Sequence, residues 1–167
     1  MTVARALAIA LGLCLAGPRA EAQGLPYTTD PEAMETAIAE ALLHLDVALS
    51  QLVDDKNKIH PAFNLKVRFP VQHPDVKEEL IWVEDLSLDE GRFAGRLANA
   101  PAYLKGTRLG DEVHFDRAQI ADWSVLDTSG RMYGHYTTRV LMAVLPEDQK
   151  APLQDLLMPD PLPEAWR

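Results

Sequence analysis

Cysteine is almost absent from this chain: its 167 residues include one, Cys14, which lies in an apolar stretch near the beginning. If that stretch is a removable leader, the remaining chain has neither a disulfide nor a reactive thiol. The folded protein then depends on packing alone for its stability.

Motifs for catalysis and cofactor binding are also missing. The chain has no G-x-G-x-x-G sequence and no phosphate-binding loop, and neither Ser124 nor Ser129 lies in the G-x-S-x-G environment of a hydrolase nucleophile. No two histidines have a metal-ligand spacing such as H-x-x-x-H; the five are His44, His60, His73, His114 and His135. We therefore predict no cofactor and no metal, with only a metal site assembled from distant parts of the chain left open.

An excess of positive charge is the third absence. Lysine and arginine number 16 against 25 aspartates and glutamates, which gives a formal net charge of −9. Nucleic acids and anionic membrane surfaces are bound by basic patches. The acidic balance therefore predicts a different class of partner.

The first 22 residues have the order of segments typical of a secretory signal peptide. A positive charge precedes the apolar stretch Ala6–Ala16, and Ala20-Glu21-Ala22 forms a small-x-small cleavage site before Gln23. The stretch is shorter than the about 20 residues that span a bilayer, so no membrane span remains after cleavage. Two alternatives are a buried N-terminal helix and a lipoprotein anchored through Cys14, which the bulky Leu13 disfavours. We predict an exported protein, periplasmic or secreted.

Removal of residues 1–22 leaves 145 residues, a length that suits one domain with its own core. The formal charge changes from −9 to −10, because two arginines and one glutamate leave with the signal. We expect a single α+β domain over residues 23–158 and an extended, proline-containing tail over residues 159–167. No repeat or linker divides the chain, and we expect a monomer.

Asp30 can cap a helix whose first residue is Pro31, and this pair predicts a helix from Pro31 to Val53. Apolar residues recur along it at steps of three and four, the spacing of one helix face. They are Met34, Ile38, Leu42, Leu45, Leu49 and Leu52. We expect this face to pack on a sheet, because an acidic opposite face is unsuited to a membrane surface.

Short strands follow the helix, and the first, FNLKVRF, alternates apolar and polar residues as a sheet with one wet face requires. The predicted strands are 63–69, 79–86, 92–98, 112–115, 120–126 and 131–134. Helical spacing follows from Tyr136 to Leu145, Pro146 and Pro152 interrupt it, and Leu153–Leu157 form a last turn or two. This order predicts an α+β fold: an N-terminal amphipathic helix, a small antiparallel sheet or partly closed barrel of five to six strands, and a C-terminal helix.

Five stretches, in this order and spacing, resemble the YegJ-like bacterial family, a domain of unknown function. They are FNLKVRF (63–69), LIWVEDL (80–86), GRLANAP (95–101), LGDEVHFDRAQIADW (109–123) and GHYTTRVL (134–141). The similarity covers most of residues 34–142. It implies one compact domain in an exported protein, and it supplies no catalytic residue.

Six polar and aromatic residues remain as candidates for a ligand-binding site: Trp82, Asn99, Asp122, Trp123, Tyr136 and Arg139. In the structural interpretation the tryptophans fill the core, Asn99 belongs to a turn, and Asp122 pairs with Arg139. In the functional interpretation, part of the set lines a groove on the sheet that binds an anionic or peptidic ligand.

The leading functional hypothesis is an exported, non-catalytic binding or interaction module that acts on an envelope protein or a small ligand. It rests on the signal peptide, the acidic surface and the missing nucleophile and metal motifs. The alternative is a small envelope hydrolase in which Asp122 works with His135 or Tyr136 as an acid–base pair. Geometry distinguishes the two, because an enzyme needs these side chains to converge in an open cleft.

Overall fold

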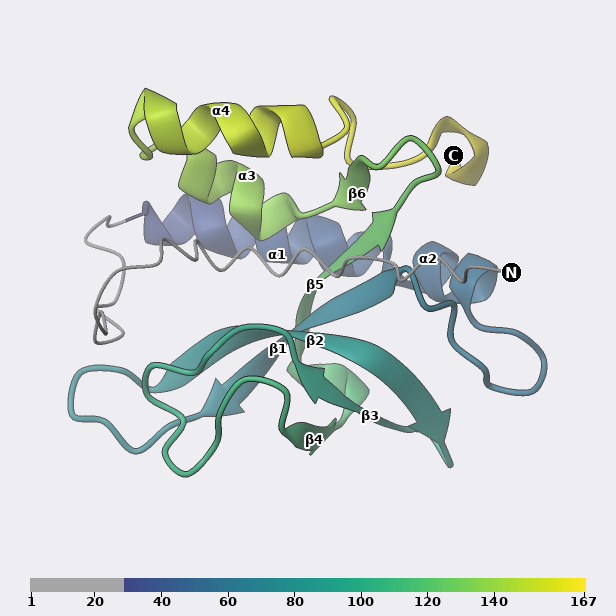
Figure 1. Cartoon of the computed structure of the whole chain (residues 1–167), viewed down its shortest axis with the longest axis horizontal. Helices are drawn as coiled ribbons and strands as arrows, with labels where there is room; N and C mark the ends of the chain where they lie inside the picture. The colour runs from purple at the N-terminus through teal and green to yellow at the C-terminus, as the bar shows by residue number, and fades with distance from the viewer. Residues whose placement is uncertain (1–28) are drawn as a thin grey trace, which may run out of the picture.

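The computed structural model describes residues 29–167, and the predicted signal peptide lies outside the described residues. Its helices are α1 (Pro31–Leu43), α2 (Leu45–Leu52), α3 (Tyr136–Met142) and α4 (Glu147–Leu156), with two 3-10 helices, η1 (Arg117–Gln119) and η2 (Glu164–Trp166). Its strands are β1 (Phe63–Pro70), β2 (Glu78–Asp89), β3 (Arg92–Leu97), β4 (Glu112–Phe115), β5 (Ile120–Leu126) and β6 (Met132–Gly134). Figure 1 shows these elements along the chain.

The six strands form one antiparallel sheet in the order β4-β3-β2-β1-β5-β6. Because β4 and β6 are both edges, the sheet is open and does not close into a barrel. The prediction of an α+β fold with a small antiparallel sheet and a C-terminal helix is therefore confirmed.

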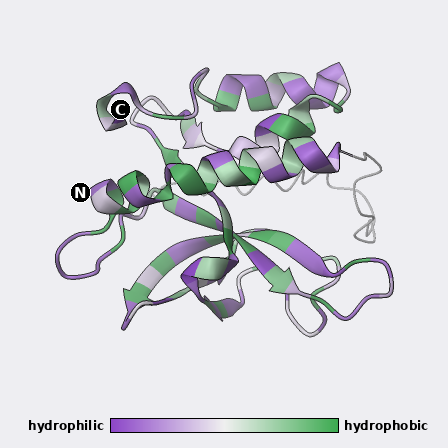
Figure 2. Cartoon of the chain, turned by 180° about the vertical axis from the view of Figure 1, so that it is seen from behind, coloured by the Kyte–Doolittle hydropathy of each residue, from purple (hydrophilic) through white to green (hydrophobic). Residues whose placement is uncertain are grey.

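The central strand β1 separates the two faces of the sheet. Its alternate residues Phe63, Leu65, Val67 and Phe69 are buried in the core, as the alternation in the sequence predicted. The residues between them, including Lys66, are half-buried on the opposite face. Figure 1 shows α1, α3 and α4 gathered beyond the sheet, with β5 and β6 rising toward them. Figure 2 shows apolar segments alternating with polar ones along the strands and along α1.

Helix α1 begins as predicted. The Asp30 side chain accepts a hydrogen bond from the backbone N–H of Glu32 at 3.0 Å, and Pro31 occupies the first turn, where its missing N–H costs nothing. The prediction of one continuous helix to Val53 is wrong, because a one-residue turn at His44 separates α1 from α2. His44 has φ −98° and ψ 0°, which takes its backbone out of the regular helical hydrogen-bond pattern.

The predicted leucine stripe is also partly wrong. Leu42 is 39% exposed, and the buried face of α1 and α2 combines two members of the predicted stripe, Ile38 and Leu45, with three alanines, Ala37, Ala41 and Ala48. Alanine is required here because the indole N–H of Trp123 donates to the backbone oxygen of Ala41 at 2.9 Å. A larger side chain at Ala41, which is 0% exposed, would hold the helix away from the indole.

We predict that Leu45→Ala lowers the free energy of unfolding by about 2–5 kcal/mol, because Leu45 is 1% exposed and packs in the core. Leu42→Ala, its matched control on the same pair of helices, is expected to cost less than about 1 kcal/mol, since the Leu42 side chain already contacts water. Urea denaturation measures both. Equal losses would show that Leu42 is covered in solution.

The C-terminal third differs from the predicted boundaries. Helix α3 ends at Met142, and a full helix, α4, replaces the one or two turns expected at Leu153–Leu157. Pro152 lies inside α4 and does not end it. The proline is tolerated because the carbonyl that loses its partner belongs to the exposed Asp148, where water can replace the N–H.

Residues after α4 cover the β6 edge of the sheet. Met158 donates its backbone N–H to the oxygen of Met132 at 2.9 Å, and Gly134 donates to the oxygen of Pro161 at 2.7 Å. Leu162 is buried, and the Trp166 ring lies 5.8 Å from that of Trp123, centre to centre. The edge strand is thereby shielded from pairing with another chain.

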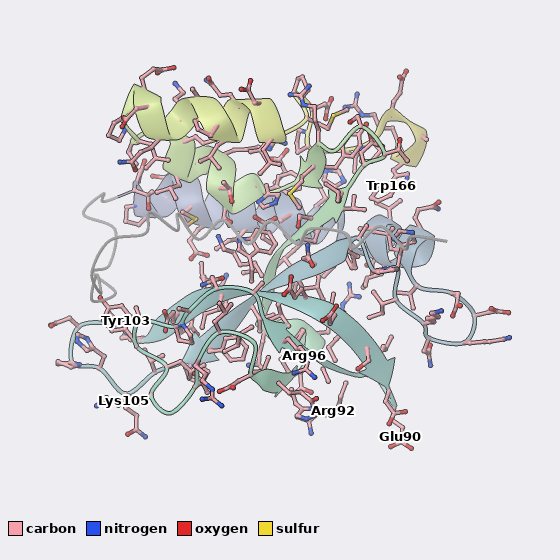
Figure 3. All side chains as sticks on the ribbon, in the orientation of Figure 1. Glu90, Arg92, Arg96, Tyr103, Lys105 and Trp166 are labelled. Atoms are coloured by element: carbon pink, nitrogen blue, oxygen red, sulfur yellow. The ribbon has the colours of Figure 1, made fainter. Side chains whose placement is uncertain are left out.

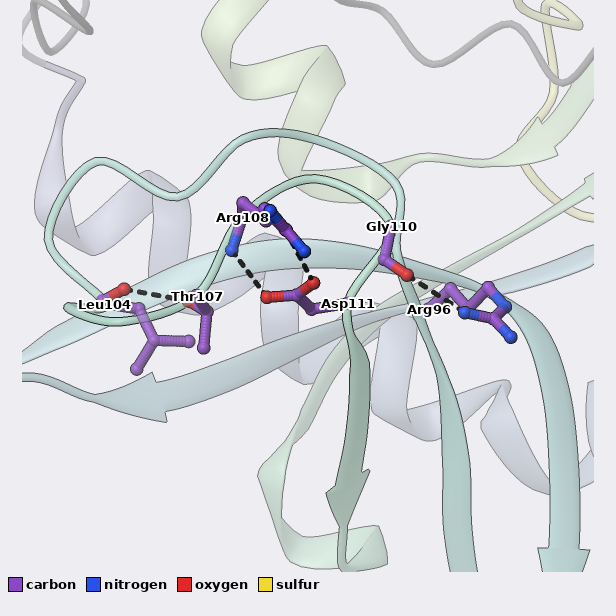
Figure 4. A network of polar contacts seen from close by, with 6 residues as sticks. All are labelled: Arg96, Leu104, Thr107, Arg108, Gly110 and Asp111. Atoms are coloured by element: carbon purple, nitrogen blue, oxygen red, sulfur yellow. Dashed lines mark hydrogen bonds and ion pairs between the residues drawn. The ribbon is translucent and has the colours of Figure 1, made fainter.

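The β3–β4 connection is the longest loop of the sheet, and its own polar contacts order it (Figure 4). The Thr107 hydroxyl donates to the Leu104 oxygen at 2.8 Å, and the Arg108 backbone N–H donates to Asp111 at 3.0 Å. Arg96 of β3 donates to the Gly110 oxygen at 3.1 Å. These bonds fix the loop beside the sheet without any buried ion pair.

Candidate functional site

A β-bulge in β5 decides which way the candidate residues point. Lys66 is paired with Asp122 and Val67 with Ile120, so Ala121 is an extra residue in β5. Side chains of paired residues share a face. Trp123 therefore lies on the core face with Leu65, and Asp122 lies on the opposite face with Lys66.

The six predicted site residues consequently separate into two groups and do not form one site. Trp82 and Asp122 belong to a polar cluster around Lys66, and the Asn99 side chain accepts a hydrogen bond from the Trp82 backbone N–H at 2.9 Å. On the other side, Trp123 and Tyr136 contact each other edge to face at 5.7 Å and adjoin α1. Arg139 follows on α3, one turn beyond Tyr136.

Asp122 is completely buried, and its carboxylate holds the start of α3. Oδ1 accepts from the backbone N–H groups of Trp123 at 2.8 Å and Tyr136 at 3.2 Å. Oδ2 accepts from the Thr137 backbone N–H at 2.8 Å and from the Thr137 hydroxyl at 2.7 Å. Four donors therefore occupy both oxygens, and the helix begins on a buried negative charge, as its dipole favours.

The predicted Asp122–Arg139 ion pair is wrong. Within residues 29–167 no salt bridge joins the two, and the Nε of Arg139 donates to the backbone oxygen of Gly134 at 3.0 Å. The cation that faces Asp122 is Lys66, through the Thr137 hydroxyl, which accepts from Nζ of Lys66 at 2.9 Å and donates to Asp122. The sequence separation of 56 residues hid this relation, which only the pairing of β1 with β5 creates.

Lys66, the Thr137 hydroxyl and Asp122 form a hydrogen-bonded relay. Burial favours the neutral forms of both Lys66 and Asp122. It raises the pKa of the Asp122 carboxyl, while the Lys66 charge and the bonds from Thr137 and Trp123 act in the opposite direction. It lowers the pKa of Lys66, and the Asp122 charge opposes that shift. The four hydrogen bonds that the carboxylate accepts favour its ionised form and so oppose the effect of burial.

Aromatic rings enclose this relay. The Lys66 ammonium lies 5.1 Å from the centre of the Trp82 ring, a cation–π arrangement, and the His135 ring lies 4.5 Å from that of Trp82. His135 precedes α3 with a left-handed backbone, φ 57°. Its Nδ1 contacts the Thr138 hydroxyl at 3.1 Å, and its buried Nε2 has no hydrogen-bond partner within residues 29–167. Trp82 therefore packs against the Lys66 ammonium and the His135 ring, which is a structural role.

We predict that His135 makes the protein sensitive to mild acid. Burial, with the charges of Lys66 and Arg139, lowers its pKa from 6.5 to about 3, so the folded state holds the ring neutral. The unfolded state binds the extra proton, and stability is lost as pH falls below 6.5. Between pH 7 and pH 5 this amounts to about 2 kcal/mol, at about 1.4 kcal/mol per pH unit.

His135→Asn is the matched variant, since asparagine tolerates a left-handed backbone and carries no titratable group. Urea unfolding of both proteins at pH 7 and pH 5 measures the effect. The variant should lose about 2 kcal/mol less than the wild type over this interval. Parallel losses in the two proteins would mean that the ring is protonated in the folded state.

Tyr136 and Arg139 line an open groove between α1 and α3, with a volume of about 530 Å³. Tyr136 is 3% exposed, and neither its hydroxyl nor Nη2 of Arg139 has a hydrogen-bond partner within the described part of the chain. Buried polar groups are almost always hydrogen-bonded, so two unpartnered donors on one helix turn are unusual. Carboxylates of Asp30, Glu32 and Glu40 line the α1 side of the same groove.

A second hollow, of about 660 Å³, lies over β2, β3 and β4. Its basic side chains have partners: Arg92 pairs with Asp116 at 3.2 Å, Arg96 donates to Gly110, and Nε2 of His114 lies 3.4 Å from Glu112. Figure 3 shows Glu90, Arg92 and Arg96 at the end of the sheet away from Trp166. Because no buried donor is unsatisfied there, the smaller groove at Tyr136 and Arg139 is the better candidate site.

Sequence reasoning named Tyr136 and Arg139 but missed Lys66, Thr137 and Glu40. Lys66 carried a signal, since the alternation of FNLKVRF places it in the middle of the polar face of β1. Glu40 carried none beyond its place on α1, because its nearness to Tyr136 arises from the contact of α1 with α3. The groove that Tyr136 and Arg139 line lies between two helices, whereas the sequence led us to expect a groove on the sheet.

No cluster of histidine, cysteine, aspartate and glutamate in residues 29–167 could hold a metal ion. Among the helices of the same residues, none is long and apolar enough to cross a membrane.

Comparison with known sequences gives two matches. Residues 31–156 match the bacterial family described as "Uncharacterized protein conserved in bacteria (DUF2314)". The chain is 24% identical over 122 residues to "Uncharacterized protein YegJ" of Escherichia coli (strain K12), covering 73% of this chain and 78% of that protein. No solved structure matches. The predicted resemblance to a YegJ-like family of unknown function is therefore confirmed.

Proposed function

The chain belongs to the DUF2314 family of uncharacterised bacterial proteins, and we propose that it is an exported, non-catalytic binding protein that acts in the cell envelope. One observation carries the proposal: the Tyr136 hydroxyl and Nη2 of Arg139 are buried beside an open groove and have no hydrogen-bond partner within residues 29–167. Leaving such groups unsatisfied costs stability, and a ligand with hydrogen-bond acceptors would satisfy both. The ligand is an envelope protein or a small molecule with such acceptors at its surface.

The surroundings of Asp122 support binding over the alternative of a hydrolase. A general base must reach the substrate, but both oxygens of the Asp122 carboxylate accept bonds from the protein's own donors in a buried site. Asp122 meets the backbone of Tyr136, while the Tyr136 side chain adjoins the groove by α1. His135 is not among the residues that line this groove. These groups do not converge in an open cleft.

Ligand retention tests the proposal. The purified chain would be incubated with an envelope extract and examined by native mass spectrometry, beside the double variant Tyr136→Phe, Arg139→Gln. We expect a bound component on the wild type that the double variant loses. Glu35→Gln is the control, since Glu35 is on the same helix α1 but pairs with Arg68 at 3.9 Å outside the groove.

Two results would contradict this proposal. One is a component retained equally by all three proteins, which would place binding elsewhere. The other is turnover of an envelope substrate that Asp122→Asn abolishes while the variant stays folded, which would favour the hydrolase.

Export has its own prediction: the chain recovered from the producing bacterium should begin at Gln23. The reason is the Ala20-Glu21-Ala22 cleavage site after an apolar stretch. Intact-mass analysis of the periplasmic and secreted fractions measures it. A retained N-terminus, or the added mass of a lipid on Cys14, would contradict the predicted cleavage.

A further inference from the structure

We propose that the groove between α1 and α3 binds a zwitterion, either a free α-amino acid or a short unblocked peptide. Its carboxylate would meet Tyr136 and Arg139, and its ammonium group would meet the acidic side of α1 at Glu40 and Glu32. The inference rests on the proposed binding function and assigns that groove its ligand class.

The α3 side of the groove is built to receive a carboxylate. Tyr136 and Arg139 are three residues apart on a helix, so their side chains are neighbours on its surface. The bond from Nε of Arg139 to the Gly134 oxygen orients the guanidinium, and Nη2 has no hydrogen-bond partner among residues 29–167. Burial, with the charges of Glu40 and Asp122, raises the pKa of Tyr136, so its hydroxyl stays a donor. A planar carboxylate can accept from both donors at once.

The α1 side of the groove has carboxylates that form no ion pair within the described part of the chain. Asp30 is used as the helix cap, and the Thr36 hydroxyl donates to the backbone oxygen of Glu32 at 2.9 Å. The side-chain carboxylates of Glu32 and Glu40 make no ion pair with any residue of 29–167. The Glu40 carboxylate is close enough to Tyr136 to raise the pKa of its hydroxyl. The Glu40 acceptor and the Tyr136 donor therefore lie on opposite walls of one groove.

The charge of the walls selects the ligand class. Three carboxylates face one guanidinium, so a simple anion would meet net repulsion on entering the groove. A simple cation would leave the Tyr136 hydroxyl and Nη2 of Arg139 unsatisfied. A molecule with both charges a few bonds apart satisfies both walls, and the amino acid backbone is the commonest such group.

Nuclear magnetic resonance titration of the ¹⁵N-labelled chain tests this inference. The probes are L-alanine, L-alanyl-L-alanine, its N-acetyl derivative without the ammonium, and its C-terminal amide without the carboxylate. We expect shifts at the backbone amides of α3 and α1 with at least one of the two zwitterions. Each blocked derivative should bind about tenfold more weakly or worse, the loss typical of one charge-assisted hydrogen bond.

Variants assign each wall of the groove to its charge. Tyr136→Phe and Arg139→Gln should weaken the dipeptide and the N-acetyl derivative about tenfold and leave the amide unchanged. Glu40→Gln should weaken the dipeptide and the amide but not the N-acetyl derivative. Glu35→Gln should change none of them. The denaturation midpoint of each variant identifies any loss that comes from unfolding.

The outcomes separate this inference from the broader proposal. If the N-acetyl derivative binds as tightly as the dipeptide and Glu40→Gln has no effect, the groove is an anion site and the zwitterion inference is wrong. If no probe binds at millimolar concentration, it is also wrong. In either case, loss of an envelope component from the Tyr136→Phe, Arg139→Gln variant would leave the proposed binding function standing.

Discussion

Asp122→Ala is expected to lower the free energy of unfolding by about 3–5 kcal/mol. The change removes the acceptor of four buried hydrogen bonds, which leaves the backbone N–H groups of Trp123, Tyr136 and Thr137 unpaired. It also leaves the Lys66 ammonium without its counter-charge. Because three of the four donors lie at the start of α3, the loss should detach that helix from the sheet. Equilibrium denaturation gives the magnitude, and hydrogen exchange of α3 amides gives the location.

A double-mutant cycle identifies the partner of Asp122. Lys66→Met keeps the apolar stem over Trp82 and removes the charge, so Asp122→Ala combined with Lys66→Met should cost clearly less than the sum of the single changes. The matched cycle with Arg139→Gln should show weaker coupling, because Arg139 donates to Gly134 and forms no salt bridge with Asp122 within residues 29–167. Stronger coupling to Arg139 than to Lys66 would overturn this assignment.

Gly134→Ala is expected to lower the free energy of unfolding by roughly 4 kcal/mol or more. Gly134 has φ +74°, a left-handed backbone that strains any residue with a side chain. A Cβ at this position would overlap the backbone oxygen of Trp123 and approach Cε3 of its ring to 2.9 Å. Backbone atoms of β5 cannot rotate away, so the β5–β6 pairing must open. Trp123 fluorescence during denaturation measures the loss.

Gly130→Ala is the control for backbone strain alone. Gly130 has φ +82°, close to that of Gly134, but a Cβ there would meet nothing within 4 Å. The control should cost about 1–3 kcal/mol, and the excess in Gly134→Ala measures the contact with Trp123. Equal costs would mean that β6 shifts enough to accommodate the methyl group.

Several features were predictable from the sequence because they depend on neighbours in the chain. The Asp30–Pro31 helix start needs only adjacent residues to satisfy the first backbone N–H groups. The bounds of β4 and β5 and the alternation of β1 were predicted, since a strand with one wet face requires a period of two. The order of these elements was enough to exclude a parallel sheet and to predict the α+β class.

The candidate site was predictable only in part. Tyr136 and Arg139 could be named because large aromatic and charged residues in a dense stretch need defined surroundings. Their use could not be assigned, because it depends on α1 lying across α3 and bringing Glu40 to the opposite wall. The burial of Leu42 was wrongly predicted for a similar reason. The spacing of apolar residues does not reveal that the Trp123 indole packs on α1 at Ala41.

The sequence by itself determined the class of fold, the start of the first helix and most strand limits, since these follow from local hydrogen bonding and hydrophobic spacing. Tertiary structure decided which charge Asp122 faces. One extra residue, Ala121, turns the Asp122 side chain to the face of Lys66 and the Trp123 side chain to the core. A charge acts through space on whatever lies within a few ångströms, and the pairing of β1 with β5 brings Lys66 there across 56 residues of chain.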